Sequence, residues 1–123
     1  MIASANKSQS GFTLVELLVV MGIISTLVTI ALPRYSQYKA HAYDSQAEMD
    51  VRSVAMAEEA YFLVNDAYLA CADAECTKLP GIQRLSTDVS LAVSTSEVGF
   101  IVTASHPKGS GKTFTWDSDK GGF

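Results

Sequence analysis

Apolar residues are distributed unevenly along the chain, and their arrangement divides it into an N-terminal run and a longer region of mixed pattern. The stretch from Phe12 to Leu32 has 21 positions, and Glu16 is its only charged residue. A helix needs about 20 largely apolar residues to cross a bilayer. The pattern therefore predicts an apolar, membrane-spanning helix over residues 12–33.

A polar segment, residues 1–11, precedes this run and has Lys7 as its only charged residue. In a secretory signal the apolar stretch is about 7 to 15 residues long and ends at a small-residue cleavage site. Here the apolar stretch continues to Leu32. Because a positive charge is typical of the cytoplasmic side, we interpret residues 1–11 as a cytoplasmic leader that precedes a retained anchor.

The helix is expected to continue beyond the apolar run. Residues 34–64 contain no proline or glycine, and their apolar side chains recur at helical spacing. Inside the run, Gly22 weakens the helix, and Pro33 lacks a backbone donor and crowds the carbonyl of Thr29. We therefore predict one long helix from residue 12 to about residue 64, with a kink or local break near Pro33.

The pattern after the helix is that of loops and short strands. Residues 65–84 contain the turn-forming pair Pro80-Gly81 and are expected to form an irregular connection. Three runs of alternating apolar residues then predict strands. These runs cover residues 89–93, 98–105 and 113–117.

Each predicted strand has one apolar face, so an antiparallel meander can pack that face on the helix. The expected fold is α+β, with a long N-terminal helix packed on a small antiparallel sheet that belongs to a head over residues 65–123. The Gly-rich tail, residues 117–123, is expected to be loose.

Composition narrows the possible functions. The formal net charge is -4, and nucleic-acid binding usually needs clustered Lys and Arg, so no nucleic-acid binding is predicted. Two cysteines, Cys71 and Cys76, are far in sequence from His41 and His106, which does not suit a zinc site. If the head is exported, the cysteines are expected to pair; two free thiols are the alternative.

Catalytic motifs are also lacking, and we predict neither an enzyme nor a cofactor. Residues 109–113, Gly-Ser-Gly-Lys-Thr, are similar to the end of a phosphate-binding loop, but they follow Pro107 and lead into a strand instead of a helix. We interpret them as a hairpin loop and His106 as a solvated turn residue.

Glu16 has two possible roles. In the first, residues 13–16 form a capping box, in which Thr13 and Glu16 satisfy backbone donors of the first helical turn. In the second, cleavage after Gly11 frees a cationic amine at Phe12, and Glu16 pairs with that amine on a neighbouring subunit. A carboxylate in a membrane segment costs about 2.5 to 3.5 kcal/mol, which such a partner would offset.

Residues 11–20, Gly-Phe-Thr-Leu-Val-Glu-Leu-Leu-Val-Val, resemble the type III signal of prepilins and related pseudopilins. The resemblance rests on a polar leader that ends in Gly11, on Phe12 directly after it, on Glu16 four residues further and on a long apolar continuation. It extends over about residues 11–43 and implies membership of the type IV pilin family.

This resemblance implies a processing pathway and a location. A prepilin peptidase would cut between Gly11 and Phe12 and methylate the new amine of Phe12. The precursor would stay in the inner membrane, in contact with lipid, until the inner-membrane pilus assembly machinery adds it to an extracellular filament of identical subunits. The expected function is that of a structural subunit of a type IV pilus.

Two other functions remain open at this point. A pseudopilin of a type II secretion system shares the same N-terminal chemistry, whereas a membrane-tethered binding module would have no need of Glu16. Motility, adhesion and DNA uptake are all compatible with a pilus subunit, because these roles depend on the exposed head and on companion proteins.

The resemblance also guides expectations for the rest of the helix. In related filaments the helix can be lost between the positions that Gly22 and Pro33 occupy here. Residues 34–64 have two apolar stripes, of which we expect the first to cover the sheet and the second to contact neighbouring subunits. The first comprises Tyr35, Tyr38, Ala42, Met49, Met56, Ala60 and Leu63, and the second Ala40, Tyr43, Ala47, Val51, Val54 and Tyr61.

Overall fold

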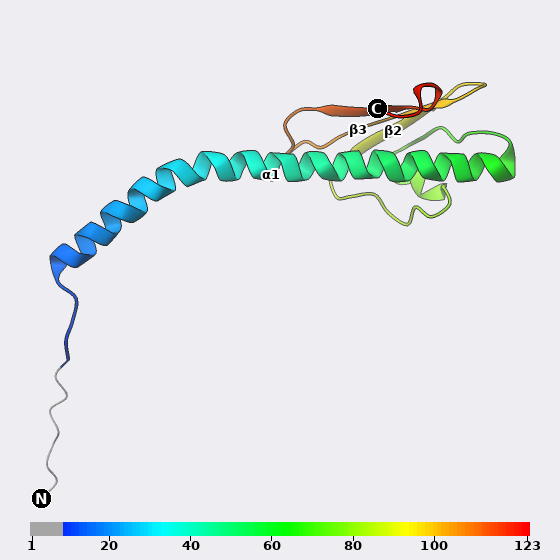
Figure 1. The fold of residues 1–123 in the computed structure, drawn as a ribbon. Coiled ribbons are helices and arrows are strands. Elements are labelled where there is room, and N and C mark those ends of the chain that lie inside the picture. Colours follow the sequence, from blue (N-terminus) through cyan, green and yellow to red (C-terminus); the bar gives the residue numbers. More distant parts are fainter. Residues whose placement is uncertain (1–8) are drawn as a thin grey trace, which may run out of the picture. The chain divides into compact units, whose positions relative to one another are not determined.

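The computed structural model describes residues 9–123, so most of the predicted leader, including Lys7, lies outside the described residues. The chain divides into two compact units, Met1–Tyr35 and Ser36–Phe123. Helix α1, Leu14–Asn65, contributes residues to both units (Figure 1).

In the first unit, residues 9–13 have no regular structure and α1 begins at Leu14, two residues after the predicted start. The polar side chains of its apolar stretch bond to the helix itself. The Ser25 hydroxyl donates to the Met21 carbonyl at 2.7 Å, and the Thr29 hydroxyl donates to the Ser25 carbonyl at 2.9 Å. These hydroxyls therefore need no water or partner in an apolar environment.

Gly22 and Pro33 both lie inside α1, and helical backbone continues through them. A side-chain carbon added at Gly22 would meet no atom within 4 Å, so packing does not require a glycine there. Loss of helix between these two residues during filament assembly stays a prediction.

The second unit packs the later part of α1 against one face of a four-stranded antiparallel sheet (Figure 1). In spatial order the strands are β1 (Cys71–Ala72), β2 (Ser90–Thr95), β3 (Phe100–Ser105) and β4 (Thr113–Asp117). Short 3₁₀ helices, Asp73–Lys78 and Ser118–Lys120, follow β1 and β4. The α+β architecture expected from the sequence is confirmed.

The predicted strands are found with small shifts at their ends, but β1 was not predicted. This edge strand pairs Cys71 with Val93 and Ala72 with Ala92. The ladder then stops, because the Asp73 carboxylate accepts the hydrogen bond of the Leu91 backbone N–H at 2.8 Å. A two-residue strand that a side chain terminates leaves no alternating pattern to recognise in the sequence.

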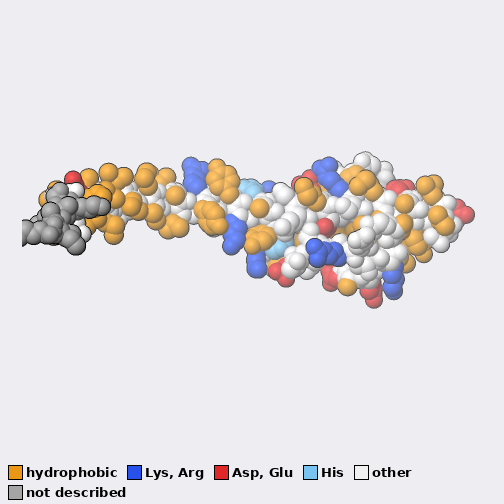
Figure 2. All heavy atoms as spheres, turned by 90° about the horizontal axis from the view of Figure 1, so that it is seen from below, with side chains coloured by type: hydrophobic (Ala, Val, Ile, Leu, Met, Phe, Trp, Pro, Cys, Tyr) orange, Lys and Arg blue, Asp and Glu red, His pale blue; other side chains and the backbone are white. Residues whose placement is uncertain are grey.

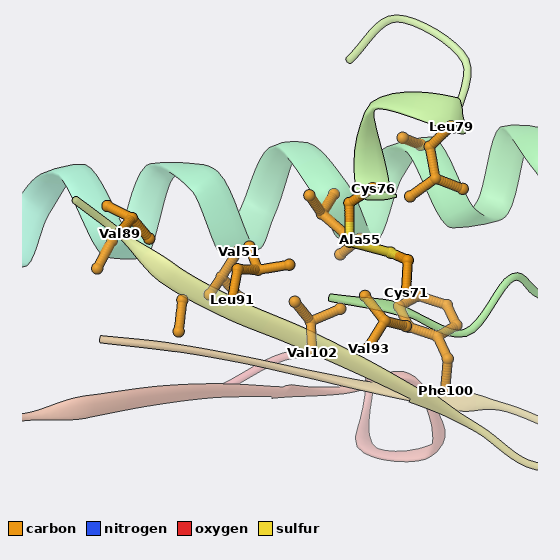
Figure 3. Packing of buried hydrophobic residues seen from close by; sticks show 14 residues of the cluster. Val51, Ala55, Cys71, Cys76, Leu79, Val89, Leu91, Val93, Phe100 and Val102 are labelled. Carbon is orange, nitrogen blue, oxygen red and sulfur yellow. A yellow bond between two sulfur atoms is a disulfide. The ribbon is translucent and has the colours of Figure 1, made fainter. Parts of the chain in front are cut away.

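The core lies between α1 and the sheet (Figure 3). The inward faces of β2 and β3 are those that alternation predicts, and their side chains are buried: Leu91, Val93, Phe100, Val102 and Ala104. The helix contributes Ala47, Val51, Val54, Ala55 and Ala57.

The predicted assignment of the two helix stripes is wrong, because it is the second stripe that covers the sheet. Ala47, Val51 and Val54 are 0% exposed, whereas Met49 and Met56 of the first stripe are each 67% exposed. Small and β-branched side chains let the helix backbone approach the strands closely. The longer side chains of the first stripe are largely exposed.

Two further expectations are corrected by the packing of the head. The tail is not loose: Asp117 and Gly122 pair as a β-bridge, and the Phe123 ring lies edge-on to Trp116 at 5.3 Å. His106 is not solvated either, since it is 4% exposed and its ring stacks on Tyr43 at 4.4 Å. Aromatic partners, Tyr43 on α1 for His106 and Trp116 on β4 for Phe123, determine both results.

Candidate assembly site at the start of the N-terminal helix

The first turn of α1 is closed by a reciprocal pair of hydrogen bonds between Thr13 and Glu16. The Thr13 backbone N–H donates to Glu16 Oε2 at 2.8 Å, and the Glu16 backbone N–H donates to Thr13 Oγ1 at 3.2 Å. This arrangement is a capping box, which satisfies two donors that the helix cannot satisfy internally. The first of the two interpretations of Glu16 therefore describes the isolated chain.

The capping box does not use all of the carboxylate. Only Oε2 bonds to Thr13, and no ion pair to Glu16 is present within residues 9–123. Glu16 also borders an apolar hollow of about 580 Å³ lined by Phe12, Val15, Leu17, Val19 and Val20. A cationic group that entered beside these side chains would find an acceptor oxygen there.

The peptide bond between Gly11 and Phe12 lies just outside the helix. Both residues are exposed, Phe12 to 86%, and neither is in a helix or strand. A side-chain carbon added at Gly11 would meet no atom within 4 Å, and its backbone does not have the left-handed conformation that favours glycine. The fold therefore imposes no glycine at position 11, and the bond is accessible to an enzyme.

Large apolar side chains surround the helix of the first unit and remain exposed. Their exposed fractions run from 43% at Val28 to 73% at Leu14 (Figure 2). By length and composition, α1 is able to cross a membrane. A surface of this kind is unfavourable in water and needs lipid or other protein chains around it.

Comparison with known proteins points to the same segment. Residues 6–32 match the family model of the prokaryotic N-terminal methylation motif. The chain is 31% identical over 67 residues to the type IV major pilin protein PilA of Myxococcus xanthus, which covers 54% of this chain and 30% of that protein.

The chain is also 40% identical over 57 residues to a fimbrial protein of Pseudomonas aeruginosa, covering 46% of this chain and 37% of the relative. With the type IV major pilin protein PilE1 of Neisseria gonorrhoeae it shares 40% identity over 58 residues, or 47% and 35% of the two chains. The N-terminal half of the chain is therefore similar to that of type IV pilins and carries their methylation motif. The matches span about a third of the length of these relatives.

In the head, three carboxylates of α1 attach loops to the helix. Asp44 accepts hydrogen bonds from Ser110, Asp50 accepts two from Ser86, and Glu58 accepts one from the Leu69 backbone N–H. Our sequence interpretation did not predict these contacts. A signal was present, because Asp44 and Glu58 continue the three- and four-residue spacing of the buried helix face.

The pKa values of the two buried carboxylates, Asp44 and Glu58, are shifted in opposite directions. The hydrogen bond from the Ser110 hydroxyl lowers the pKa of Asp44, because it stabilises the ionised form. Burial raises the pKa of Glu58, which is 0% exposed and whose Oε1 has no hydrogen-bond partner among the described residues. Compared with a carboxyl group in water, Asp44 is stabilised in its charged form and Glu58 is destabilised in its charged form.

The two cysteines form a disulfide bond with a Cα–Cα distance of 5.2 Å (Figure 3). Cys76 is 0% exposed and Cys71 is 7% exposed, so the bond belongs to the core. It connects β1 to the 3₁₀ helix Asp73–Lys78 and precedes β2, β3 and β4 along the chain. This bond stabilises the turn after β1.

Other residues considered for chemistry have structural contacts. Gly109 lies in the loop between β3 and β4, next to the Asp44 carboxylate, and Thr113 starts a strand, as the hairpin interpretation requires. The Nδ1 atom of His106 accepts the Lys108 backbone N–H at 3.0 Å. Within residues 9–123, no group of three His, Cys, Asp or Glu side chains is placed to hold a metal ion.

Proposed function

We propose that this chain is a structural, non-enzymatic subunit of a type IV pilus. A prepilin peptidase cuts between Gly11 and Phe12 on the cytoplasmic side and methylates the amine of Phe12. The apolar part of α1 then holds the subunit in the inner membrane. The inner-membrane assembly machinery moves the subunit into an extracellular filament, in which the same helix is surrounded by other subunits.

The observation that supports this proposal best is the helix of the first unit. It is apolar on all sides, exposed, and begins with one carboxylate next to an exposed Gly–Phe bond. Lipid and a bundle of identical helices are both apolar surroundings, so one sequence is stable in both. The relatives named as major pilins and fimbrial proteins support the same role.

Glu16 has a distinct part in this proposal. The capping box occupies Oε2 in the single chain, and we propose that the other oxygen binds the methylated amine of Phe12 on an adjacent subunit. Methylation keeps the charge of the amine. Ion pairing offsets the cost of placing the carboxylate in an apolar environment, which is about 2.5 to 3.5 kcal/mol for an unpaired group.

The two roles of Glu16 are separated by comparing T13V with E16Q in cells that lack the wild-type chain. Thr13→Val removes the hydroxyl half of the capping box and keeps the carboxylate. Glu16→Gln keeps an acceptor for the Thr13 N–H and removes the charge. Glu59→Gln removes a different exposed carboxylate of α1 and is the control.

We expect subunits in sheared surface filaments for wild type, T13V and E59Q, and a loss of at least tenfold for E16Q at equal precursor levels. Mass spectrometry of the sheared material identifies the subunit. If T13V and E16Q lost filament subunits equally, Glu16 would act only as a helix cap. Normal filaments in E16Q would refute the proposed pairing. Processed wild-type chains that never reach surface filaments would refute the pilus assignment.

A further inference from the structure

Positive charge in the second unit is concentrated in two short segments. Residues 36–43 contain Lys39, residues 106–112 contain Lys108 and Lys112, and neither segment contains an acidic residue. Residues 44–105, by contrast, contain ten Asp or Glu against three Lys or Arg. This local excess of positive charge occurs in a chain with a net charge of -4.

The fold brings the two segments together. A hollow of about 310 Å³ is lined by Ser36, Lys39, Ala40 and Tyr43 from α1 and by Lys108 and Gly109 from the loop between β3 and β4. The loop is held there by Asp44, which accepts the Ser110 backbone N–H at 3.0 Å and the Ser110 hydroxyl at 2.6 Å. Two lysines that are 69 positions apart therefore border the same hollow.

The ammonium groups of this hollow are available to an external anion. Lys39 is exposed and forms no ion pair within residues 9–123. Lys108 has a long contact of 3.5 Å with Asp88, and both side chains are at least half exposed, so this pair contributes little. The nearby Asp44 carboxylate is already bonded to Ser110.

The hollow begins soon after the apolar run along the chain. Lys39 is seven residues beyond Leu32, the last residue of the apolar run. At about 1.5 Å per residue, seven residues of helix rise about 10 Å. The headgroup region on each side of the hydrocarbon core is about 5 to 8 Å thick, so the long side chain of a lysine seven residues after an apolar run is within reach of lipid phosphates.

We propose that this hollow binds the phosphate of an anionic phospholipid headgroup while the subunit is in the membrane; the inference rests on the membrane stage of the proposed function. Lys39 and Lys108 neutralise the phosphate from two sides, and the Ser36 hydroxyl is a donor on the same rim. A zwitterionic headgroup is bound less well, because its own cation is repelled by the two ammonium groups.

The test uses the full chain in phosphatidylcholine bicelles, titrated with short-chain phosphatidylglycerol. Backbone amide NMR signals of Lys108, Gly109 and Ser110 are followed, and inorganic phosphate at matched ionic strength is titrated in parallel. The variant K39Q/K108Q removes both lysines. The control K78Q/R84Q removes two exposed positive charges outside the hollow and changes the net charge equally.

We expect saturable shifts with phosphatidylglycerol and on the order of tenfold weaker binding for K39Q/K108Q, as membrane-surface lysines usually give, but not for the control. Equal weakening in both variants, the same response to inorganic phosphate, or no shifts at all would overturn the inference. If amides of residues 12–32 exchange freely with water, the membrane stage fails as well. If the amides of residues 12–32 are protected but the Gly109 signal does not shift, the lipid-binding inference is overturned and the membrane stage is not.

Discussion

The carboxylate of Asp44 holds Ser110 through both the backbone N–H and the hydroxyl, and so joins α1 to a loop 66 residues further along the chain. This contact also explains Gly109, the residue before Ser110. A side-chain carbon at position 109 would overlap the Asp44 carboxylate oxygen, although the Gly109 backbone does not have a left-handed conformation. The close approach of the loop to the helix therefore requires a glycine.

We predict that Gly109→Ala destabilises the head chiefly by displacing Asp44. The single variants G109A and D44A are each expected to lower the unfolding free energy by about 1 to 3 kcal/mol, because each disrupts the hydrogen bonds of a buried carboxylate. In the D44A background the alanine at position 109 has more room. Gly109→Ala is therefore expected to lower the unfolding free energy by about 1 kcal/mol less, or by a still smaller amount, than it does in wild type. Chemical denaturation of the four full-length chains in detergent measures this coupling, and additive effects would contradict it.

The opposite pKa directions of Asp44 and Glu58 predict opposite pH effects on stability. The folded-state pKa of Asp44 is lowered, so its contribution is complete above the ordinary value of about 3.9 and is lost as the pH falls through the folded value. The folded-state pKa of Glu58 is raised, so stability decreases as the pH rises from about 4.3 through the folded value.

The pH effects are separated with D44N and E58Q. Between pH 3 and 7, D44N is expected to lack the fall in stability that wild type shows as the pH decreases toward 3. E58Q is expected to lack the fall in stability that wild type shows as the pH rises. The replacement at position 58 keeps an acceptor for the Leu69 N–H, whereas E58L removes it and is expected to be less stable than E58Q at every pH. A profile for E58Q that runs parallel to wild type would show that Glu58 does not titrate in this range.

The sequence predicted the elements that have a strong local pattern. The apolar run, the Gly11–Phe12–Glu16 motif and the inward faces of β2 and β3 could all be found from neighbouring residues. The orientation of the helix on the sheet could not, because both stripes are apolar. The choice between them depends on how closely Ala47 can approach strands that are distant in sequence. His106 and Phe123 were misjudged for the same reason, since their ring partners come from other elements.

The corrected helix orientation predicts which substitutions destabilise the head. Val51→Ala and Val54→Ala each remove two methyl groups from fully buried positions and are expected to cost about 2 kcal/mol of unfolding free energy. Met49→Ala and Met56→Ala affect exposed side chains and are expected to stay within about 0.5 kcal/mol of wild type. Thermal or denaturant unfolding in detergent makes the comparison. If the methionine variants were the more damaging ones, the helix would face the sheet with its first stripe.

Loss of the disulfide is expected to weaken the edge of the sheet first. Replacing both cysteines by alanine removes a short-loop constraint, for which a loss of about 2 kcal/mol is the usual scale. Because β1 pairs through only two residues, its amides should exchange faster in C71A/C76A, while those of β3 should exchange more nearly as in wild type. Hydrogen exchange with mass spectrometry resolves the two strands. Uniform acceleration across the sheet would mean that the disulfide stabilises the whole head.

The exposed bond after Gly11 predicts a processing defect without a folding defect. Gly11→Val adds a β-branched side chain where nothing in the described chain is within 4 Å, so the head is expected to be unchanged while the peptidase is obstructed. The uncut chain has an amide at Phe12 instead of a cationic amine and leaves Glu16 without its proposed partner. We therefore expect G11V to accumulate as full-length precursor in the membrane and to be absent from surface filaments. Gly22→Ala, at another glycine with open surroundings, should be cut normally. Intact-mass measurement distinguishes the cut chain from the uncut one. A methylated Phe12 terminus in G11V at wild-type levels would contradict the prediction.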